Sequence, residues 1–317
     1  MTSPDPATIS SDESELTKIT RRHRVEHWVY RTMRNFVLRL GPTGLRITRL
    51  FFRWLLGTVF RANRNVIDAN LAIAFQDATP AEREDIARKN YDWVARVMLE
   101  ILRMSWWPGR TESLSKFHNI EDLDEALEDG KGALVVSMHF GNWEMITPAL
   151  AEKGYDTFIY VGAQSNPLVN KDQVDNRECT GAKAIHKGPK VGFQFMRALR
   201  GRNVVTLLAD QNDRKSDLFV DFLGRKASVQ KGLAGFHIAR KSPIVFTYAV
   251  LEDDITNIYF KRLRPELTGD KEQDQHIVTQ MYFDEIGKVV RKWPSQYFWM
   301  HRRYRTRPPG DTERIYD

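Results

Sequence analysis

A histidine followed five positions later by a glutamate, His139 and Glu144, is the pattern with the clearest chemical potential in this sequence. The histidine comes directly after an apolar run, residues 133–138, that is typical of a buried parallel strand. The glutamate falls in the first turn of a helix that we expect to begin near Trp143, with Asn142 as its N-cap. We therefore expect the imidazole at the carboxyl end of a strand, with the carboxylate fixing its tautomer.

Such a pair predicts a general base that removes the proton of an alcohol. A zinc site is the competing chemistry, but zinc-binding helices favour ligands four residues apart. A separation of five residues on one helix turns two side chains roughly 140° away from each other, so we predict no metal. From these residues alone, a histidine that is merely satisfied by its neighbours stays an open interpretation.

The elements that position these side chains alternate between strands and helices over most of the chain. This alternation predicts an α/β fold with a mostly parallel central sheet flanked by helices. Asp210 ends a second apolar strand, so it shares a sheet edge with His139 if both strands are parallel, although a loop cap is the alternative. The expected strands are 133–138, 157–161, 184–185, 204–209, 218–222, 243–251 and 257–263, and the expected helices are 66–75, 81–104, 143–152, 166–180, 191–199, 232–240 and 275–292.

Cysteine usage and motif content narrow the class of protein further. A single cysteine, Cys179, excludes a disulfide framework and suits a reducing compartment. The chain contains no Gly-x-Ser-x-Gly motif, so a serine acyl-enzyme is not expected. No motif implies an organic cofactor, and we predict none.

Positive charge is concentrated near the N-terminus. The whole chain carries a net charge of +7, whereas residues 17–64 contain twelve Lys and Arg residues against one acid, Glu26. Residues 1–16 are short, polar and acidic, and we predict that they are disordered. Nucleic acid would also attract such charge, but no recognised reader motif accompanies it, so we predict no nucleic-acid partner.

Residues 17–64 also carry two apolar stripes at helical spacing, on either side of Gly41-Pro42. Neither stripe offers about 20 uncharged residues, so we predict a basic amphipathic hairpin on an anionic lipid leaflet rather than a membrane span. The alternative is that both stripes pack on the protein's own core while the arginines are solvated. The first stripe comprises Trp28, Val29, Met33, Phe36, Val37 and Leu40, and the second comprises Ile47, Leu50, Phe51, Trp54 and Leu55, with Arg46, Arg49 and Arg53 on its other side.

Several motifs, in order from about Asn65 to Arg307, resemble the bacterial lipid A late acyltransferases, the lauroyl and myristoyl transferase family of the glycerolipid acyltransferase superfamily. His-Phe-Gly-Asn-Trp-Glu at 139–144 is similar to the family's His-x4-Asp/Glu motif. The other similar segments are Asn-Leu-Ala-Ile-Ala-Phe at 70–75, Ala-Glu-Arg-Glu at 81–84, Leu-Leu-Ala-Asp-Gln at 207–211, Phe-Leu-Gly-Arg at 222–225 and the signature at 294–303.

The resemblance implies transfer of a fatty acyl chain from acyl-acyl carrier protein to a hydroxyl of a lipid A precursor, without a covalent intermediate. The enzyme would be peripheral or monotopic on the cytoplasmic face of the bacterial inner membrane, in contact with anionic inner-leaflet lipids. Residues 65–317 would form the acyltransferase domain, with His139 as the base and Glu144 as its partner. Two alternatives stay open: a lysophospholipid or other lyso-lipid as acceptor, and an inactive peripheral membrane protein of the same fold.

Substrate would meet two further regions. Main-chain N–H groups beside Gly141 are candidates for holding the tetrahedral oxyanion. The basic run at 301–307 is expected to form a surface for lipid phosphates or an acidic carrier protein. The expected substrate-binding residues are Gly141, Asn142, Asp210, Gln211, Arg177, Arg302 and Arg303.

One departure from the family's pattern concerns an arginine. The family usually carries Tyr-Arg a few residues before Asn-Pro, whereas here the stretch before Asn166-Pro167 contains no arginine. Such an arginine would hold an anionic group or the developing oxyanion. Arg177 is the first candidate to replace it, and Lys187 and Lys171 are the others.

Overall fold

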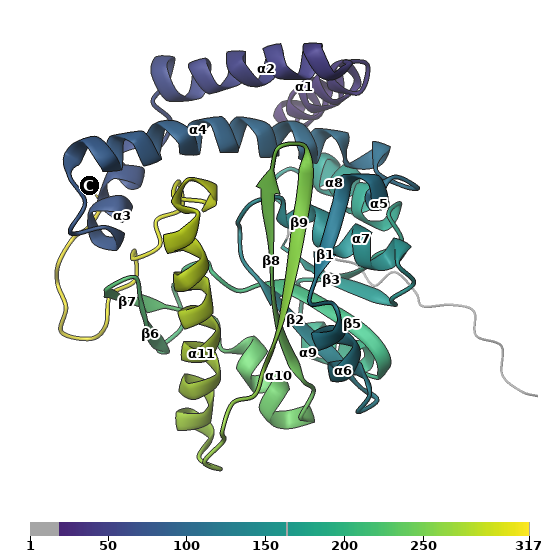
Figure 1. Cartoon of the computed structure of the whole chain (residues 1–317), viewed down its shortest axis with the longest axis vertical. Helices are drawn as coiled ribbons and strands as arrows, with labels where there is room; N and C mark the ends of the chain where they lie inside the picture. The colour runs from purple at the N-terminus through teal and green to yellow at the C-terminus, as the bar shows by residue number, and fades with distance from the viewer. Residues whose placement is uncertain (1–18, 163, 317) are drawn as a thin grey trace, which may run out of the picture.

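Two N-terminal helices, α1 and α2, lie across the long helix α4 at one end of the molecule (Figure 1). The computed structural model describes residues 19–162 and 164–316, so the acidic segment 1–16 predicted to be disordered lies outside the described residues. The first helix ends before Gly41, and Pro42 opens the second, where its missing N–H leaves no donor unpaired. The three helices are α1 (Arg21–Leu38), α2 (Pro42–Trp54), which continues as a π-helix η1 (Leu55–Val59), and α4 (Pro80–Arg103).

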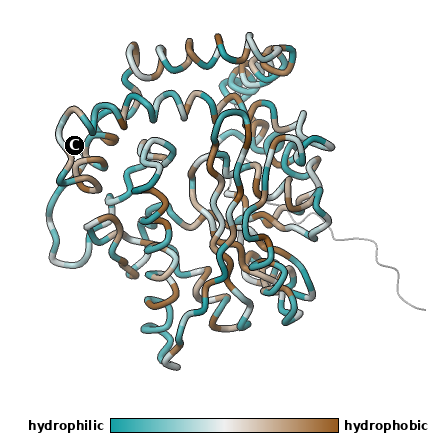
Figure 2. Tube along the Cα trace, viewed as in Figure 1, coloured by the Kyte–Doolittle hydropathy of each residue, from teal (hydrophilic) through white to brown (hydrophobic). Residues whose placement is uncertain are grey.

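The outer side of α1 and α2 is apolar. Eleven of the fourteen large apolar side chains that are exposed in the described residues lie between residues 19 and 60. The second predicted stripe faces outward through Ile47, Leu50, Phe51 and Trp54, while Arg49 faces α4 and pairs with Asp92 at 3.4 Å. The alternative prediction, that this stripe packs on the protein's own core, is therefore wrong. Figure 2 shows the alternation of hydrophobic and hydrophilic residues along α2.

The first stripe is divided between the two sides of α1. Val37 is buried and Met33 packs beside it against α4, whereas Trp28 and Phe36 are exposed. No helix in residues 19–162 and 164–316 is long and apolar enough to cross a bilayer.

The centre of the molecule is a seven-stranded sheet in the order β1-β9-β8-β2-β5-β3-β4. Strands β4, β3, β5, β2 and β8 are parallel to one another, β9 runs antiparallel to β8, and β1 is parallel to β9. The predicted α/β fold with a mostly parallel sheet is confirmed. The strands are β1 (Ser115–His118), β2 (Lys131–Ser137), β3 (Thr157–Val161), β4 (Lys183–His186), β5 (Gly201–Leu208), β8 (Ile244–Glu252) and β9 (Ile255–Leu263).

Helices cover both faces of this sheet because its central strands are apolar on both sides. In β2, Leu134 and Val136 join the core on one face, and Ala133 and Val135 join the core on the other. The first core is covered by α3 (Arg64–Ala74), α9 (Val191–Ala198), α10 (Gly232–Arg240) and α11 (Lys271–Lys292), and the second by α6 (Glu121–Leu127) and α7 (Ile146–Glu152). Two further helices are α5 (Thr111–Leu114) and α8 (Pro167–Glu178), and short 3-10 turns lie at η2 (Met104–Trp106), η3 (Trp143–Met145) and η4 (Pro294–Gln296).

The structure differs from the predicted elements in several places. The expected strand 218–222 is β6 (Phe219–Phe222), which pairs with β7 (Arg225–Ser228) in a separate two-stranded sheet instead of joining the central one. The expected helix 143–152 begins with η3 and becomes α-helical only at Ile146. Strand β1 and helix α6 were not predicted, because both are short and half polar.

Candidate active site

The register of two neighbouring strands brings His139 and Asp210 together. Ser137 of β2 lies opposite Leu208 of β5, and the histidine and the aspartate each follow two residues later. Nδ1 of the imidazole lies 2.7 Å from Oδ1 of the carboxylate. A carboxylate can only accept a hydrogen bond, so Nδ1 carries a proton, and in the neutral ring Nε2 then presents a lone pair. The side chain of Asp210 is 3% exposed and that of His139 is 21% exposed, so part of the imidazole is open to solvent while the carboxylate is not.

Electrostatics keep Asp210 ionised. Burial has the largest effect on its pKa and would raise it. The positive charge and the hydrogen bonds of His139, together with the charge of Arg303, act in the opposite direction, and the pKa of Asp210 is lowered overall. The carboxylate is therefore negatively charged at neutral pH and can stabilise a protonated His139.

Glu144 has a different partner from the expected one. Its carboxylate accepts two hydrogen bonds from Arg177, from Nε at 2.9 Å and from Nη2 at 2.6 Å. The glutamate lies in the 3-10 turn η3, which points its side chain toward α8, and Asp210 takes the place at Nδ1 of His139 that the sequence assigned to Glu144. The prediction that Glu144 fixes the tautomer of His139 is therefore wrong, because its carboxylate does not contact the imidazole.

The ion pair of Glu144 and Arg177 is buried beside the imidazole. Burial has the largest effect on the pKa of Glu144 and would raise it, but Arg177, with a contribution from His139, lowers it overall. The charge of Glu144 is in turn the main reason why the pKa of Arg177 is raised. Of the three basic residues proposed to replace the family arginine, Arg177 contacts a site residue, whereas Lys171 pairs with Asp175 and Lys187 is exposed.

The turn after His139 is fixed by its main-chain N–H groups. Gly141 donates to the carbonyl oxygen of Gln296 at 2.9 Å, and Asn142 donates to that of Ala249 at 3.1 Å. The expectation that N–H groups beside Gly141 are free for an oxyanion is therefore wrong. Gly141 has a φ of +54°, and a Cβ there would lie 1.5 Å from the Ala249 oxygen, so the close approach requires glycine.

Asn142 occupies the expected N-cap position, but its side chain does not cap the helix. The amide is 1% exposed, and its Nδ2 donates to Oγ1 of Thr256 at 3.3 Å. Both Gly141 and Asn142 thus fix the turn after His139 by contacts with other segments.

The open side of the imidazole is bordered by an amide and two aromatic rings. Nε2 of Gln211 lies 3.3 Å from Nε2 of His139, which agrees with an unprotonated His139 nitrogen that accepts a hydrogen bond. The ring centroids of Trp143 and Phe298 lie 5.3 Å and 6.2 Å from that of the imidazole. A polar donor at Nε2 and two aromatic rings therefore border the imidazole.

The C-terminal segment supplies residues whose roles the sequence did not indicate. Nε2 of His301 accepts a hydrogen bond from the N–H of Asn212 at 3.0 Å. Burial is the main reason why the pKa of His301 is lowered from 6.5 to about 4. These contacts join residues 89 positions apart, and no local pattern signals them.

The two arginines of this segment have different environments. Arg302 is exposed, as expected for a basic surface. Arg303 is 2% exposed, donates from Nη1 to the carbonyl oxygen of Ser228 at 2.7 Å, and lies over the rings of Phe222 and Phe283. The prediction that Arg303 contacts phosphates at the surface is therefore wrong, and its charge instead contributes to lowering the pKa of Asp210.

Comparison with known proteins gives this geometry a context. Residues 15–306 match the family model described as bacterial lipid A biosynthesis acyltransferase. A protein of Haemophilus influenzae named lipid A biosynthesis acyltransferase is 23% identical over 84% of this chain and 86% of its own length. The lipid A biosynthesis lauroyltransferase of Escherichia coli is 23% identical over 77% of this chain and 80% of its own. The phosphatidylinositol mannoside acyltransferase of Mycolicibacterium smegmatis is 24% identical over 68% and 70%.

The lowered pKa of His301 predicts that the free energy of unfolding decreases in acid. A buried imidazole with a folded pKa of about 4 and an ordinary value of 6.5 stays neutral while the unfolded chain takes up a proton. Its contribution to stability is present above pH 6.5 and is lost as the pH falls toward 4, by up to about 3 kcal/mol. Replacing His301 by Gln, which keeps a hydrogen-bond acceptor, should reduce the acid dependence of the unfolding free energy measured by urea titration. The exposed His276→Gln variant is the control, and equal acid dependence in all three proteins would contradict the prediction.

Proposed function

The chain belongs to the family of bacterial lipid A biosynthesis acyltransferases, and we propose that it moves a fatty acyl chain from acyl-acyl carrier protein to a hydroxyl of a lipid A precursor. The observation that carries the proposed mechanism is the 2.7 Å contact between His139 and Asp210 at the ends of two parallel strands. This contact leaves Nε2 of the imidazole as a base on the open side of the site.

The reaction proceeds by direct transfer. Nε2 of His139 takes the proton of the acceptor hydroxyl while that oxygen attacks the thioester carbonyl carbon. The tetrahedral intermediate collapses, the carbon–sulfur bond breaks, and the imidazolium returns the proton to the leaving thiolate. The products are an ester and the free thiol of the carrier, and the enzyme ends in its starting protonation state.

Charged groups around the imidazole support the transient imidazolium. Asp210 accepts the Nδ1 hydrogen bond, holds the ring in the productive tautomer and supplies a negative charge. Glu144 adds a second, more distant negative charge, and Arg177 fixes the position of its carboxylate. The amide of Gln211 lies beside Nε2 and is suited to donate to the oxyanion once the acceptor hydroxyl has displaced it from the ring.

A different acceptor is the second candidate. The stretch before Asn166-Pro167 lacks the arginine that the resembling family usually carries there, and the mycobacterial relative is named for phosphatidylinositol mannoside. An acceptor whose charge does not lie where that arginine would bind it, such as a lysophospholipid or another lyso-lipid, would not need that arginine. The chemistry at His139 would be the same for both acceptors.

The surface formed by α1, α2 and η1 suits attachment to an anionic bilayer, at the cytoplasmic face of the inner membrane. Exposed apolar side chains of this surface include Trp28, Ile47 and Phe51, and exposed arginines such as Arg31 and Arg46 lie among them. An apolar surface of this kind with positive charge beside it is typical of interfacial helices. The active site lies at the same end of the molecule, because α4 contacts both the hairpin and the turn after His139.

We predict that His139→Ala abolishes transfer, because general-base catalysis contributes about 10²–10⁴ in rate. Asp210→Asn should lower turnover by less, since the ring is still hydrogen-bonded but is held in the wrong tautomer and without the charge. The measurement is transfer of a radiolabelled acyl chain from acyl-acyl carrier protein, with a lipid A precursor and a lysophospholipid offered separately. Unfolding by heat must be unchanged in both variants. Turnover of His139→Ala near that of the wild type would refute the mechanism. If only the lysophospholipid were labelled, the lipid A precursor would be wrong as the proposed acceptor.

We predict that Arg177→Ala raises the acceptor KM or lowers turnover, because a hydrogen bond to a charged group contributes about 1.5–3 kcal/mol. The exposed Lys187, which follows β4, is the matched comparison. Lys187→Ala should have ordinary kinetics if Arg177 replaces the missing family arginine. Ordinary kinetics in both variants would show that neither residue does so, and the lyso-lipid acceptor would then be favoured.

We predict that neutralising Arg31, Arg39 and Arg46 to Gln weakens binding to anionic vesicles. Each basic residue near such a surface contributes about 1 kcal/mol, and all three side chains are exposed on α1, α2 or the turn between them. Co-sedimentation with vesicles that contain phosphatidylglycerol measures the change. Neutralising Lys116, Lys153 and Lys271, which are exposed elsewhere, should have no comparable effect. Equal loss in the two triple variants would mean that the hairpin does not select the bilayer.

A further inference from the structure

Helix α8 carries Arg177 to the active site, yet few apolar contacts hold this helix. Val174 is its buried apolar side chain, and Asn176 is its other buried residue. A helix with so narrow an apolar side depends on polar contacts for its exact position. Because Arg177 makes both of its hydrogen bonds to Glu144 from the last turn of α8, any displacement of the helix moves this pair.

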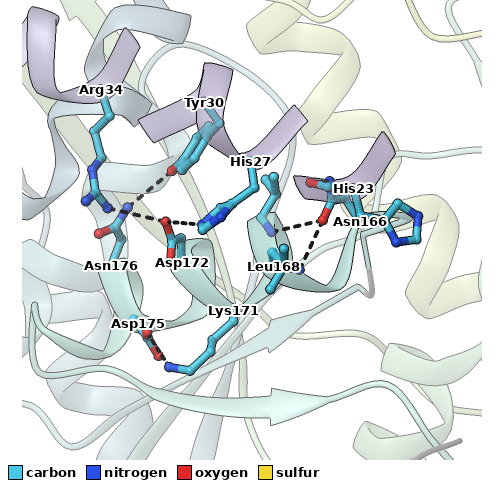
Figure 3. Close-up of polar contacts among 11 residues, drawn as sticks. His23, His27, Tyr30, Arg34, Asn166, Leu168, Lys171, Asp172, Asp175 and Asn176 are labelled. Atoms are coloured by element: carbon cyan, nitrogen blue, oxygen red, sulfur yellow. Dashed lines mark hydrogen bonds and ion pairs between the residues drawn. The ribbon is translucent and has the colours of Figure 1, made fainter. Parts of the chain in front are cut away.

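Besides the Arg177–Glu144 pair, several polar contacts of α8 come from one side of α1 (Figure 3). Asp172 lies at their centre. Nε2 of His27 lies 3.1 Å from its Oδ2, and Nη1 of Arg34 lies 3.8 Å from the same oxygen. One turn further along α8, Nδ2 of Asn176 donates to the hydroxyl of Tyr30 at 3.4 Å. The spacing of residues 27, 30 and 34 places all three side chains on one face of α1.

The start of α8 is tied to α1 as well. Oδ1 of Asn166 accepts hydrogen bonds from the N–H groups of Leu168 and Val169 and so caps α8. Nδ2 of the same amide donates to the carbonyl oxygen of His23 and to Oε2 of Glu26, each at 2.9 Å. A single side chain thus joins the first turn of α8 to the first turn of α1.

The other side of α1 faces solvent. Val25, Trp28 and Phe36 are exposed there, and Arg24 and Arg31 are exposed beside them. Helix α1 therefore has two different faces. The outer face is suited to lipid, and the inner face holds α8, the helix that carries Arg177. The side chains of Asp172, His27 and Arg34 are each about one-fifth exposed, so the attraction between Asp172 and Arg34 is screened less than that of a surface pair.

We propose that Asp172 is a positioning residue that links the lipid-facing helix α1 to the Arg177–Glu144 pair beside His139. This inference rests on the proposed function. Asp172 holds α8 against His27 and Arg34, and α8 holds Arg177 in register with Glu144. Attachment of α1 to a bilayer restricts the motion of its inner face, and the contacts at Asp172 transmit that restriction to the site. Loss of Asp172 leaves the outer face intact and loosens Arg177.

The test compares Asp172→Ala with Asp175→Ala on acceptor embedded in phosphatidylglycerol-containing vesicles. Asp175 lies on the same helix, but it pairs with Lys171 at the exposed surface. We expect Asp172→Ala to bind vesicles like the wild type and to lose about 10-fold to 100-fold in kcat, because a small displacement of a positioned group has effects of this size. Asp175→Ala should keep the wild-type kcat. Asp172→Glu, which keeps the charge, should recover part of the loss.

A double variant separates positioning from a general loss of structure. If Asp172 acts through Arg177, then adding Asp172→Ala to Arg177→Ala should cause little further loss of kcat. A wild-type kcat in Asp172→Ala, or full additivity in the double variant, would overturn the inference. If Asp172→Ala does not fold, His27→Ala combined with Arg34→Gln removes the same contacts from α1, and the same two outcomes decide. Absence of transfer by the wild type on these vesicles would count against the proposed function instead.

Discussion

The site depends on one constraint, the parallel register of β2 and β5. Ser137 opposite Leu208 is the pairing that sets His139 beside Asp210, and the ladder continues past the strands with the N–H of Ala209 on the carbonyl oxygen of Ser137. A slip by one residue would turn the alternating side chains of a strand to the opposite face. The register is fixed because both faces of β2 are buried in separate apolar cores. The packing of the sheet interior thereby determines which carboxylate reaches the imidazole.

Beyond the ends of the strands, the C-terminal segment takes over the task of holding the site. The N–H of Phe298 donates to the carbonyl oxygen of His139, and the side chain of Gln296 bonds both the N–H and the carbonyl group of Leu251. Two buried amides complete the arrangement: Asn90 donates to the carbonyl oxygens of Ser295 and Tyr297, and Asn70 donates to those of Trp299 and His301. An irregular segment can be buried because side chains of α3 and α4 satisfy its main-chain carbonyls.

The sequence predicted what local pattern determines and missed what distant partners determine. Buried apolar runs located β2, β3 and β5 closely, and the parallel arrangement then made Asp210 a candidate beside His139. The partner of Glu144 could not be read in the same way, because the choice depends on the direction of a 3-10 turn and on where α8 lies. The same limit explains Arg303: a run of basic residues indicates a surface, and only the fold reveals the aromatic rings that cover one of them.

The amphipathic N-terminal helices show why periodicity alone left two interpretations open. A stripe at helical spacing indicates that one face leaves water, but protein and lipid are equally suitable partners for it. The structure separates the two in α2: Arg49 pairs with Asp92 of α4, whereas Ile47 and Phe51 are exposed on the outer side. The polar residues of α1 act in the same way, since His27 and Arg34 face α8 and leave Trp28 exposed. In both helices, partly buried polar contacts orient the hairpin and leave its apolar side exposed. An acceptor lipid held at that surface would lie at the same end of the molecule as His139, because α4 packs under the hairpin and bonds the turn after the histidine through Trp93.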